Sequence, residues 1–260
     1  MTIRLVLAFA LVACSGSNPT GTGVESPDAG NGNTGGGGTT PPGGGGSGSS
    51  TTGGGIPDTI TISGQAIVQD QTTETPQSGV AIGVYATGDD STALATATTD
   101  GSGNYSVTLT TNGAAIDGYI KATKSGLVDT YVYPPAPMQS DSSTAVASMI
   151  STSNYSELVG IEGASSNDGM IILDVLDASL APISGATVAT SPSSGKAFYM
   201  NSSDEPFSTS STYTDGLAFL FNVPTSGAVT LDATKSGSTF TSHAVTARAG
   251  KLTTTVVIAQ

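Results

Sequence analysis

Residues 99–109 read TDGSGNYSVTL, and this stretch decides the fold class. Its first part, residues 99–104, is rich in Gly, Asp and Asn, which suit tight turns with positive φ. In its second part the apolar residues Tyr105, Val107 and Leu109 alternate with polar ones, the period-2 pattern of a strand with one buried face. The segment therefore predicts a turn that leads into an antiparallel strand.

The same texture continues along the chain from residue 57 onward. Short alternating runs, such as Ile60 with Ile62 and the segments 80–84 and 171–175, are separated by Gly, Asp, Asn and Pro. Charged residues make up only 10% of the chain and aromatic residues 5%, with no Trp. This profile is typical of β-rich extracytoplasmic modules rather than helical enzymes, so we expect an all-β protein.

The strand order occurs twice. The segment 122–126, ATKSG, recurs unchanged at 233–237, and Thr-Asp-Gly at 99–101 recurs at 214–216. A Pro-x-Ser-Gly segment also occurs in both copies, at 76–79 and 182–185. A repeat of this length predicts duplicated structural units. We therefore expect two tandem antiparallel Greek-key β-sandwiches, domain 1 at 57–150 and domain 2 at 168–260, joined by a connector at 151–167.

This repeated order resembles the carboxypeptidase regulatory-like domain, a transthyretin-like β-sandwich common in bacterial envelope proteins. The resemblance covers residues 58–135 and 168–260, and the Asn-Val-Pro of residues 222–224 continues it closely in the second copy. The first copy departs from the pattern at residues 110–118, which lack that tripeptide. The resemblance implies a transthyretin-like or Ig-like sandwich in each copy and a place in the cell envelope.

The N-terminus has the form of a signal peptide at residues 1–13. An apolar run, Leu5–Val12, follows a short basic start, and it is shorter than the roughly 20 residues that span a bilayer. Residues 11–14, LVAC, resemble the lipobox of bacterial lipoproteins, which implies cleavage before Cys14 and lipid attachment to its thiol. By the same resemblance, Ser15 favours sorting to the outer membrane. The alternative is an ordinary secretory signal with an incidental cysteine.

Two segments are expected to link rather than to form sandwiches. Residues 14–56 hold the predicted lipidated cysteine and a low-complexity Gly/Ser/Thr linker, which cannot bury enough apolar surface to fold. In the connector at 151–167 we expect a short helix. Asn154 and Glu157 have the spacing of a capping box, and Gly160 is a stop signal.

The charge of the chain restricts its partners. Seven basic and 20 acidic residues give a formal net charge of −13. Such a surface repels phosphate backbones and anionic lipid headgroups, so we expect no nucleic-acid partner and no electrostatic grip on a membrane. The predicted membrane contact is the lipid on Cys14.

The residues that could support catalysis or metal binding are few. The single histidine, His243, lies in a strand-like run, and Ser193 with Lys196 has nucleophile spacing but loop-like neighbours. Calcium is conceivable at residues 89–90, Asp-Asp, or at Asp100 with Asn104, although turn formation is the favoured role of these residues. We therefore expect no enzyme activity, no metal and no cofactor.

Binding surfaces are the remaining option. Tyr131 and Tyr133 share one face of a predicted strand, and Tyr119 is close in sequence, so exposed rings could stack on sugars. The other interpretation is that they pack against the sandwich. The sequence thus predicts a non-enzymatic, lipid-anchored envelope protein with a structural, adhesive or partner-binding role. A carbohydrate-binding surface lipoprotein is the alternative, and envelope proteins or polysaccharides are the expected partners. The oligomeric state is left open.

Overall fold

The computed structural model describes residues 55–70, 73–161, 163–199 and 210–260. The predicted signal peptide, Cys14 and nearly all of the predicted linker lie outside the described residues. The folded part of the chain runs from Ile56 to Gln260 within one compact unit.

The described residues form fifteen strands and one helix, which confirms the all-β prediction. The first repeat contains β1 (Thr59–Asp70), β2 (Thr73–Pro76), β3 (Ala81–Ala86), β4 (Ala93–Thr98), β5 (Asn104–Thr110), β6 (Gly118–Thr123), β7 (Thr130–Val132) and β8 (Ser142–Met149). After α1 (Thr152–Ile161), the second repeat contains β9 (Gly169–Leu176), β10 (Thr187–Ser191), β11 (Lys196–Tyr199), β12 (Leu217–Val223), β13 (Ala228–Thr234), β14 (His243–Thr246) and β15 (Leu252–Ile258).

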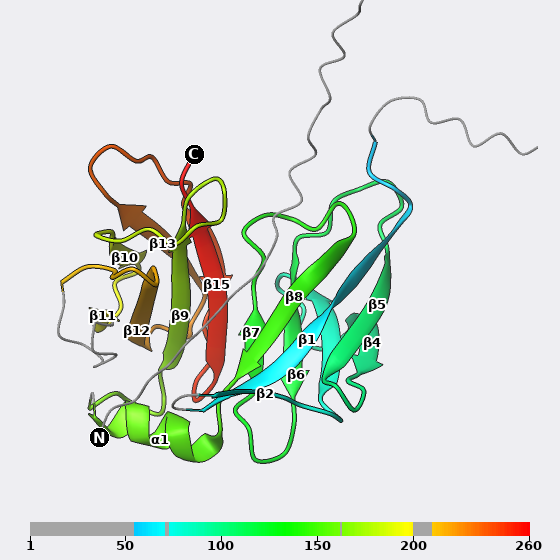
Figure 1. Cartoon of the computed structure of the whole chain (residues 1–260), viewed down its shortest axis with the longest axis horizontal. Coiled ribbons are helices and arrows are strands. Elements are labelled where there is room, and N and C mark those ends of the chain that lie inside the picture. Colours follow the sequence, from blue (N-terminus) through cyan, green and yellow to red (C-terminus); the bar gives the residue numbers. More distant parts are fainter. Residues whose placement is uncertain (1–54, 71–72, 162, 200–209) are drawn as a thin grey trace, which may run out of the picture. The chain divides into compact units, whose positions relative to one another are not determined.

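These strands form three sheets (Figure 1). One holds β2, β1 and β5, with β8 paired to β1, and a second holds β10, β13 and β14. The third, called the long sheet below, has eight strands in the order β11-β12-β9-β15-β7-β6-β3-β4. The long sheet therefore runs through both repeats, which meet where β15 pairs with β7.

The pairing differs from the predicted purely antiparallel sandwiches. β1 pairs with β8 in parallel, and β15 is parallel to both β9 and β7. Parallel neighbours require long crossover connections, and each of these pairs is separated by several intervening strands or by the helix. Local alternation carries no information about such distant partners, so the sequence pattern could not reveal them.

The long sheet has two faces, which the register around β15 defines. Thr254 aligns with Val132 and Ile172, whereas its neighbour Thr253 aligns with Tyr131 and Ile171. Since successive side chains of a strand point to opposite sides, the first set lies on one face, here called face A, and the second on face B.

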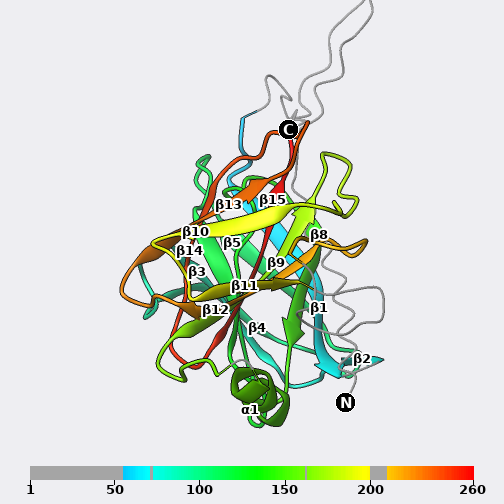
Figure 2. The ribbon, with the colours of Figure 1, turned by 90° about the vertical axis from the view of Figure 1, so that its left-hand side faces the viewer.

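The two small sheets cover opposite faces of the long sheet at opposite ends. On face A of the first repeat, Val84, Ile120 and Val132 form one core cluster with Ile60 and Ile62 of β1. On face B of the second repeat, the core cluster consists of residues from β9 and β12 with residues from β13, namely Ile171, Leu173, Leu220, Val229 and Leu231. Figure 2 shows β13 and β10 in front of β9, with β1 and β8 to the right.

Helix α1 packs at the second-repeat end of face A. Tyr155 and Leu158 join the cluster of Ile172, Phe219 and Val256. The hydroxyl of Ser151 accepts a hydrogen bond from the backbone N–H of Asn154 (3.1 Å), so Ser151 is the N-cap.

The helix is confirmed, but its predicted limits are wrong. No capping box forms at Asn154, because Asn154 already lies in the first turn behind the Ser151 cap. The helix also continues through Gly160 to Ile161, and the glycine with positive φ follows later, at Gly163 (φ 58°).

Candidate functional site

Four tyrosines gather on face B where the two repeats meet. We call Tyr85, Tyr119, Tyr131 and Tyr133 the tyrosine cluster. Register places Tyr85 of β3 opposite Tyr119 of β6, and β7 carries Tyr131 beside them. The centroid of the Tyr119 ring lies 5.6 Å from that of Tyr85, 5.7 Å from that of Tyr131 and 5.1 Å from that of Tyr133. Such separations are those of favourable aromatic pairs.

The cluster is mostly buried. Tyr131 is 5% exposed, Tyr133 is 3% exposed and Tyr119 is fully buried, which agrees with packing against the sandwich rather than with an exposed stacking surface at Tyr131 and Tyr133. On face B these rings pack in one core cluster with Val188, Val245 and Ala247 of the second repeat, and Arg248 lies over the Tyr131 ring. Only Tyr85 of the four keeps a partly exposed ring.

A single arginine from the second repeat enters this cluster. The guanidinium carbon of Arg248 lies 3.9 Å from the ring centroid of Tyr131 and 4.7 Å from that of Tyr119, which is cation–π geometry. Its Nη1 donates to the hydroxyl of Tyr133 (3.2 Å). Its Nε and Nη2 donate to the two carboxylate oxygens of Asp90, at 2.9 and 2.6 Å. We call this set of contacts the Arg248 clamp.

The charges of the clamp are fixed at neutral pH. The hydrogen bond from Arg248 lowers the pKa of Asp90, and the Tyr119 hydroxyl, which also donates to that carboxylate, acts in the same direction. Burial raises the pKa of the Tyr119 hydroxyl above its ordinary value, and its bond to Asp90 adds to this. For Arg248, burial opposes the charge, but the bonds to Asp90 and Tyr133 outweigh it and raise the pKa. The arrangement joins two parts of the fold through a permanent ion pair.

Of the candidate catalytic residues, His243 and Lys196 lie on different sheets and Ser193 lies in a loop. His243 belongs to β14 and aligns with Leu231 of β13, and burial lowers its pKa while Asp117 opposes this shift. Ser193 donates to the carbonyl of Ser194 (3.1 Å) in the loop before β11. The ammonium of Lys196 lies 5.8 Å from the Phe198 ring centroid. Among the described residues, no hydrogen bond joins any two of these three side chains.

The acidic residues considered for calcium form turns or the clamp. The Oδ1 of Asp89 accepts the backbone N–H groups of Ser91 (2.9 Å) and Thr92 (3.1 Å). The Oδ1 of Asp100 likewise accepts those of Ser102 (2.8 Å) and Asn104 (2.9 Å). These are Asx-type turns, as favoured from the sequence. Within the described part of the chain, no group of three or more His, Cys, Asp or Glu side chains could hold a metal ion.

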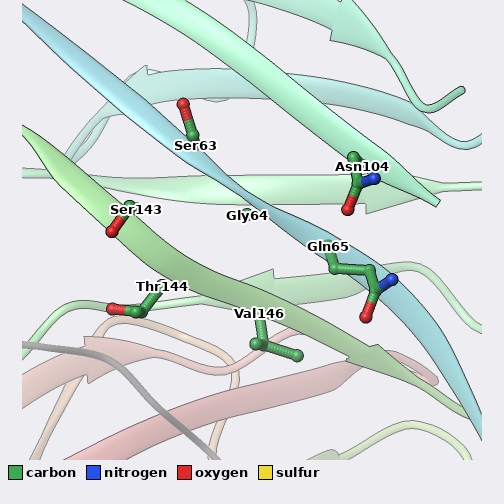
Figure 3. A pocket seen from close by; sticks show the side chains of 7 residues that line it. All are labelled: Ser63, Gly64, Gln65, Asn104, Ser143, Thr144 and Val146. Carbon is green, nitrogen blue, oxygen red and sulfur yellow. The ribbon is translucent and has the colours of Figure 1, made fainter. Parts of the chain in front are cut away.

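Two hollows open on the sheet surfaces. The first, of about 440 Å³, lies over β1, β5 and β8, and its polar lining includes Ser63, Gln65, Asn104, Ser143 and Thr144 (Figure 3). The Gln65 amide already donates to the carbonyl of Ser102 (2.8 Å), so part of this lining is satisfied internally. The second, of about 490 Å³, lies over β3, β4 and β6 and includes the partly exposed Tyr85.

Sequence reasoning missed the clamp and the role of Tyr85. One signal was available, since Arg248 is the only arginine after Arg4 in a chain with seven basic residues. An arginine in so acidic a chain is a candidate for a specific pair with a carboxylate. No local pattern, however, could have named Asp90, which lies 158 residues away.

Comparison with known proteins gives distant structural likeness only. No family model matches the chain, and no curated protein matches it. The fold is similar to the shaft pilin SpaA from Lactobacillus rhamnosus GG (TM-score 0.26, 11% identity, 77% of this chain and 97% of that chain). It is also similar to GBS52, the minor pilin of Streptococcus agalactiae (0.27, 12%, 77% and 95%), and to the Bacillus anthracis TIE protein (0.25, 12%, 77% and 34%).

TM-scores this low do not establish a common fold, so the all-β assignment rests on the strands of this chain alone. Among the described residues, no helix has the length and apolar character needed to cross a membrane.

Proposed function

We propose that this protein is a non-enzymatic, lipid-anchored component of the bacterial cell envelope, with Ile56–Gln260 serving as a structural and adhesive module. The observation that carries the proposal is the way the two repeats are joined. β15 of the second repeat pairs with β7 of the first, and the Arg248 clamp closes the same junction. A structural or adhesive module must keep its binding surface in a fixed orientation, and a rigid connection between the two repeats would provide this.

The joint contains several bonds that would have to break together. The backbone N–H of Leu252 donates to the carbonyl of Asp129 (3.1 Å), and the hydroxyl of Thr255 donates to the carbonyl of Tyr133 (3.0 Å). An ion pair between Lys251 and Asp129 (2.8 Å) adds to them. Since these bonds act in parallel, separating the repeats requires their concerted loss, which favours transmission of orientation and load rather than hinge motion.

The membrane contact in this proposal is the lipid on Cys14. It is supported by the lipobox-like tetrad at residues 11–14 and by the low-complexity segment that follows. Multiple acyl chains give firm anchoring at about 0.8 kcal/mol per buried methylene, whereas one chain holds only marginally. Residues 15–55 would then link the lipid to the folded module. The outer membrane is the proposed location.

Lipid labelling tests the anchoring. The full chain and its Cys14→Ala variant are expressed in a bacterium with two membranes and fed labelled palmitate. We expect label in the protein and recovery in the outer-membrane fraction for the natural chain, and loss of both for the variant. Two results would contradict the proposal: absence of label in the natural chain, or equal recovery of the natural chain and the Cys14→Ala variant in the outer-membrane fraction.

The alternative function, carbohydrate binding, no longer has Tyr131 and Tyr133 as its platform, because both are buried. A different observation now favours it, the partly exposed Tyr85 at the second hollow.

A further inference from the structure

The first-repeat end of face B is an uncovered sheet surface with a groove in it. The groove has a volume of about 490 Å³ and runs over β4, β3 and β6. The residues that line it include Gly83, Tyr85, Thr96, Thr98, Lys121 and Thr123. Thr96 and Thr98 are exposed, and Tyr85, Lys121 and Thr123 are half-buried, so solvent reaches this end of the face.

The groove owes its depth to small residues on the central strand. Register places Gly83 between Thr96 on one side and Lys121 on the other. A Cβ atom at Gly83 would lie only 2.7 Å from Cε2 and 3.1 Å from the hydroxyl oxygen of Tyr85. The Tyr85 ring therefore lies back over Gly83, and its position depends on the missing side chain.

The neighbouring ring of Tyr119 also fixes the orientation of Tyr85. Its ring is nearly parallel to that of Tyr119, with an interplanar angle of 12°. Tyr119 in turn is fixed by the Arg248 clamp. A partly exposed aromatic ring is thus presented in one orientation at the end of the groove, which lowers the entropy cost of stacking a ligand on it.

The charge of the groove is opposite to that of the molecule. The chain has a net charge of −13, yet no Asp or Glu lines the groove. The Lys121 ammonium lies 5.5 Å from the Tyr131 ring centroid, and no described carboxylate forms an ion pair with it. The charge of Lys121 does help to lower the pKa of the nearby Asp90, but both carboxylate oxygens of Asp90 already accept hydrogen bonds from Arg248. The groove can therefore receive an anionic group without repulsion from its own lining.

We propose that this groove binds an acidic saccharide. A sugar ring stacks on Tyr85, its hydroxyls exchange hydrogen bonds with Thr96, Thr98 and Thr123, and its carboxylate pairs with Lys121. A saccharide fits better than a peptide, because the groove offers side-chain hydroxyls on the face of the sheet. An extended peptide would instead use the backbone edge of β4, the last strand of the long sheet, and the peptide probe below tests that outcome. The inference deepens the proposed adhesive function and rests on it.

Binding of defined oligosaccharides by the purified full chain tests the proposal. The probes are a tetramer of galacturonic acid, a neutral glucose tetramer and an oligoglutamate peptide, followed by isothermal titration calorimetry. We expect the acidic tetramer to bind at least tenfold more tightly than the other two. Tyr85→Ala and Lys121→Gln should each weaken it at least tenfold, and Tyr85→Phe should retain it.

Matched controls separate binding from folding. Lys196 also lies over an aromatic ring, at 5.8 Å, but on β11 at the far end of the long sheet, so Lys196→Gln should leave binding unchanged. Gly83→Ala should weaken binding by displacing the Tyr85 ring. Circular dichroism of every variant must show the strand signal of the natural chain, and Tyr85→Phe reports on the ring if Tyr85→Ala does not fold.

Several outcomes overturn the proposal. These are no binding of the acidic tetramer, equal binding of the neutral tetramer, preference for the peptide, and unchanged affinity in folded Lys121→Gln. A chain that binds the saccharide but takes up no palmitate contradicts the anchoring alone. A labelled chain that binds no saccharide contradicts the groove alone.

Discussion

The two ends of face B of the long sheet differ, because one is covered by a second sheet and the other is open. In the second repeat, Ile171, Leu173 and Leu220 point to this face and lie under the sheet of β10, β13 and β14. In the first repeat, the same face carries Gly83 and Lys121 and has no covering sheet. The strands belong to one continuous sheet, so strand pairing does not decide which end is covered. The side chains that alternate onto the face decide it, because only large apolar ones gain from a second layer.

The tyrosine cluster marks the border between these two ends. Its rings are apolar enough to be buried beside β15, and their hydroxyls and π-faces accommodate Arg248. Amphipathic side chains are suited to a position where a dry core ends and a wet surface begins.

The largest expected loss of stability follows from a substitution in the covered end. Leu173→Ala removes a fully buried side chain from the core of face B and should lower the free energy of unfolding by about 2–5 kcal/mol, because a cavity remains. Thr96→Ala at the open end is the matched control and should change it by no more than about 0.5 kcal/mol. Urea unfolding monitored by circular dichroism measures both, and similar losses in the two variants would show that the ends do not differ.

The next effect concerns the border. Arg248→Ala removes the clamp and should cost about 2 kcal/mol, since hydrogen bonds to charged groups and cation–π contacts each contribute on that order. Its side chain is 14% exposed, whereas in the Lys251–Asp129 pair both side chains are about a third exposed. Lys251→Ala should therefore cost no more than about 1 kcal/mol. A double-mutant cycle with Asp90→Ala measures the coupling energy between the two side chains. A coupling energy near zero would show that the Arg248–Asp90 ion pair does not stabilise the junction of the two repeats.

A smaller effect tests a polar group buried in the second repeat. Asp174 of β9 lies on face A, is 3% exposed, and its Oδ2 has no hydrogen-bond partner among the described residues. Burial, with a contribution from Asp215, raises the pKa of Asp174 well above its ordinary value. The folded chain therefore binds this proton more tightly than the unfolded chain does, so ionisation of the group opposes folding above the unfolded pKa.

Asp174→Asn removes that opposition and should raise the free energy of unfolding at pH 7. The gain should shrink as the pH falls towards the unfolded value near 3.8, where both states hold the proton. Lys121→Gln on the open end should show no comparable stabilisation. Urea unfolding at a series of pH values measures this, and a gain that is independent of pH would contradict the explanation.

The smallest effect is expected at His243. Burial lowers its pKa below 6.5, so below pH 6.5 the unfolded chain takes up a proton that the folded chain still excludes. Stability should therefore fall as the pH drops below 6.5 until the folded value is reached, and His243→Gln should flatten this part of the profile. Thermal unfolding between pH 5 and 8 measures it. A natural chain whose stability is constant through this range would contradict the assignment.

The sequence predicted what depends on neighbours along the chain. Alternation placed Tyr105, Val107 and Leu109 on a buried face, and all three are 5% exposed or less. It also placed Tyr131 and Tyr133 on one face, but it could not say that Arg248 and apolar residues of the second repeat would cover that face. Register between distant strands depends on the summed packing of the whole fold. For the same reason, the groove at Tyr85 could not be predicted from a local motif.

The position of β15 has a consequence for biosynthesis. Translation produces β15 after every other described strand, yet β15 lies between β9 and β7 in the long sheet, and its Thr255 contacts Tyr133, 122 residues earlier. The first repeat must therefore wait, with one side of β7 unpaired, until the second repeat has been made. Contacts of such sequence separation slow folding, and an unpaired strand invites pairing with other chains. We expect the nascent chain to need protection during this interval, and substitutions in β15 to reduce yield more than they reduce the stability of the finished protein.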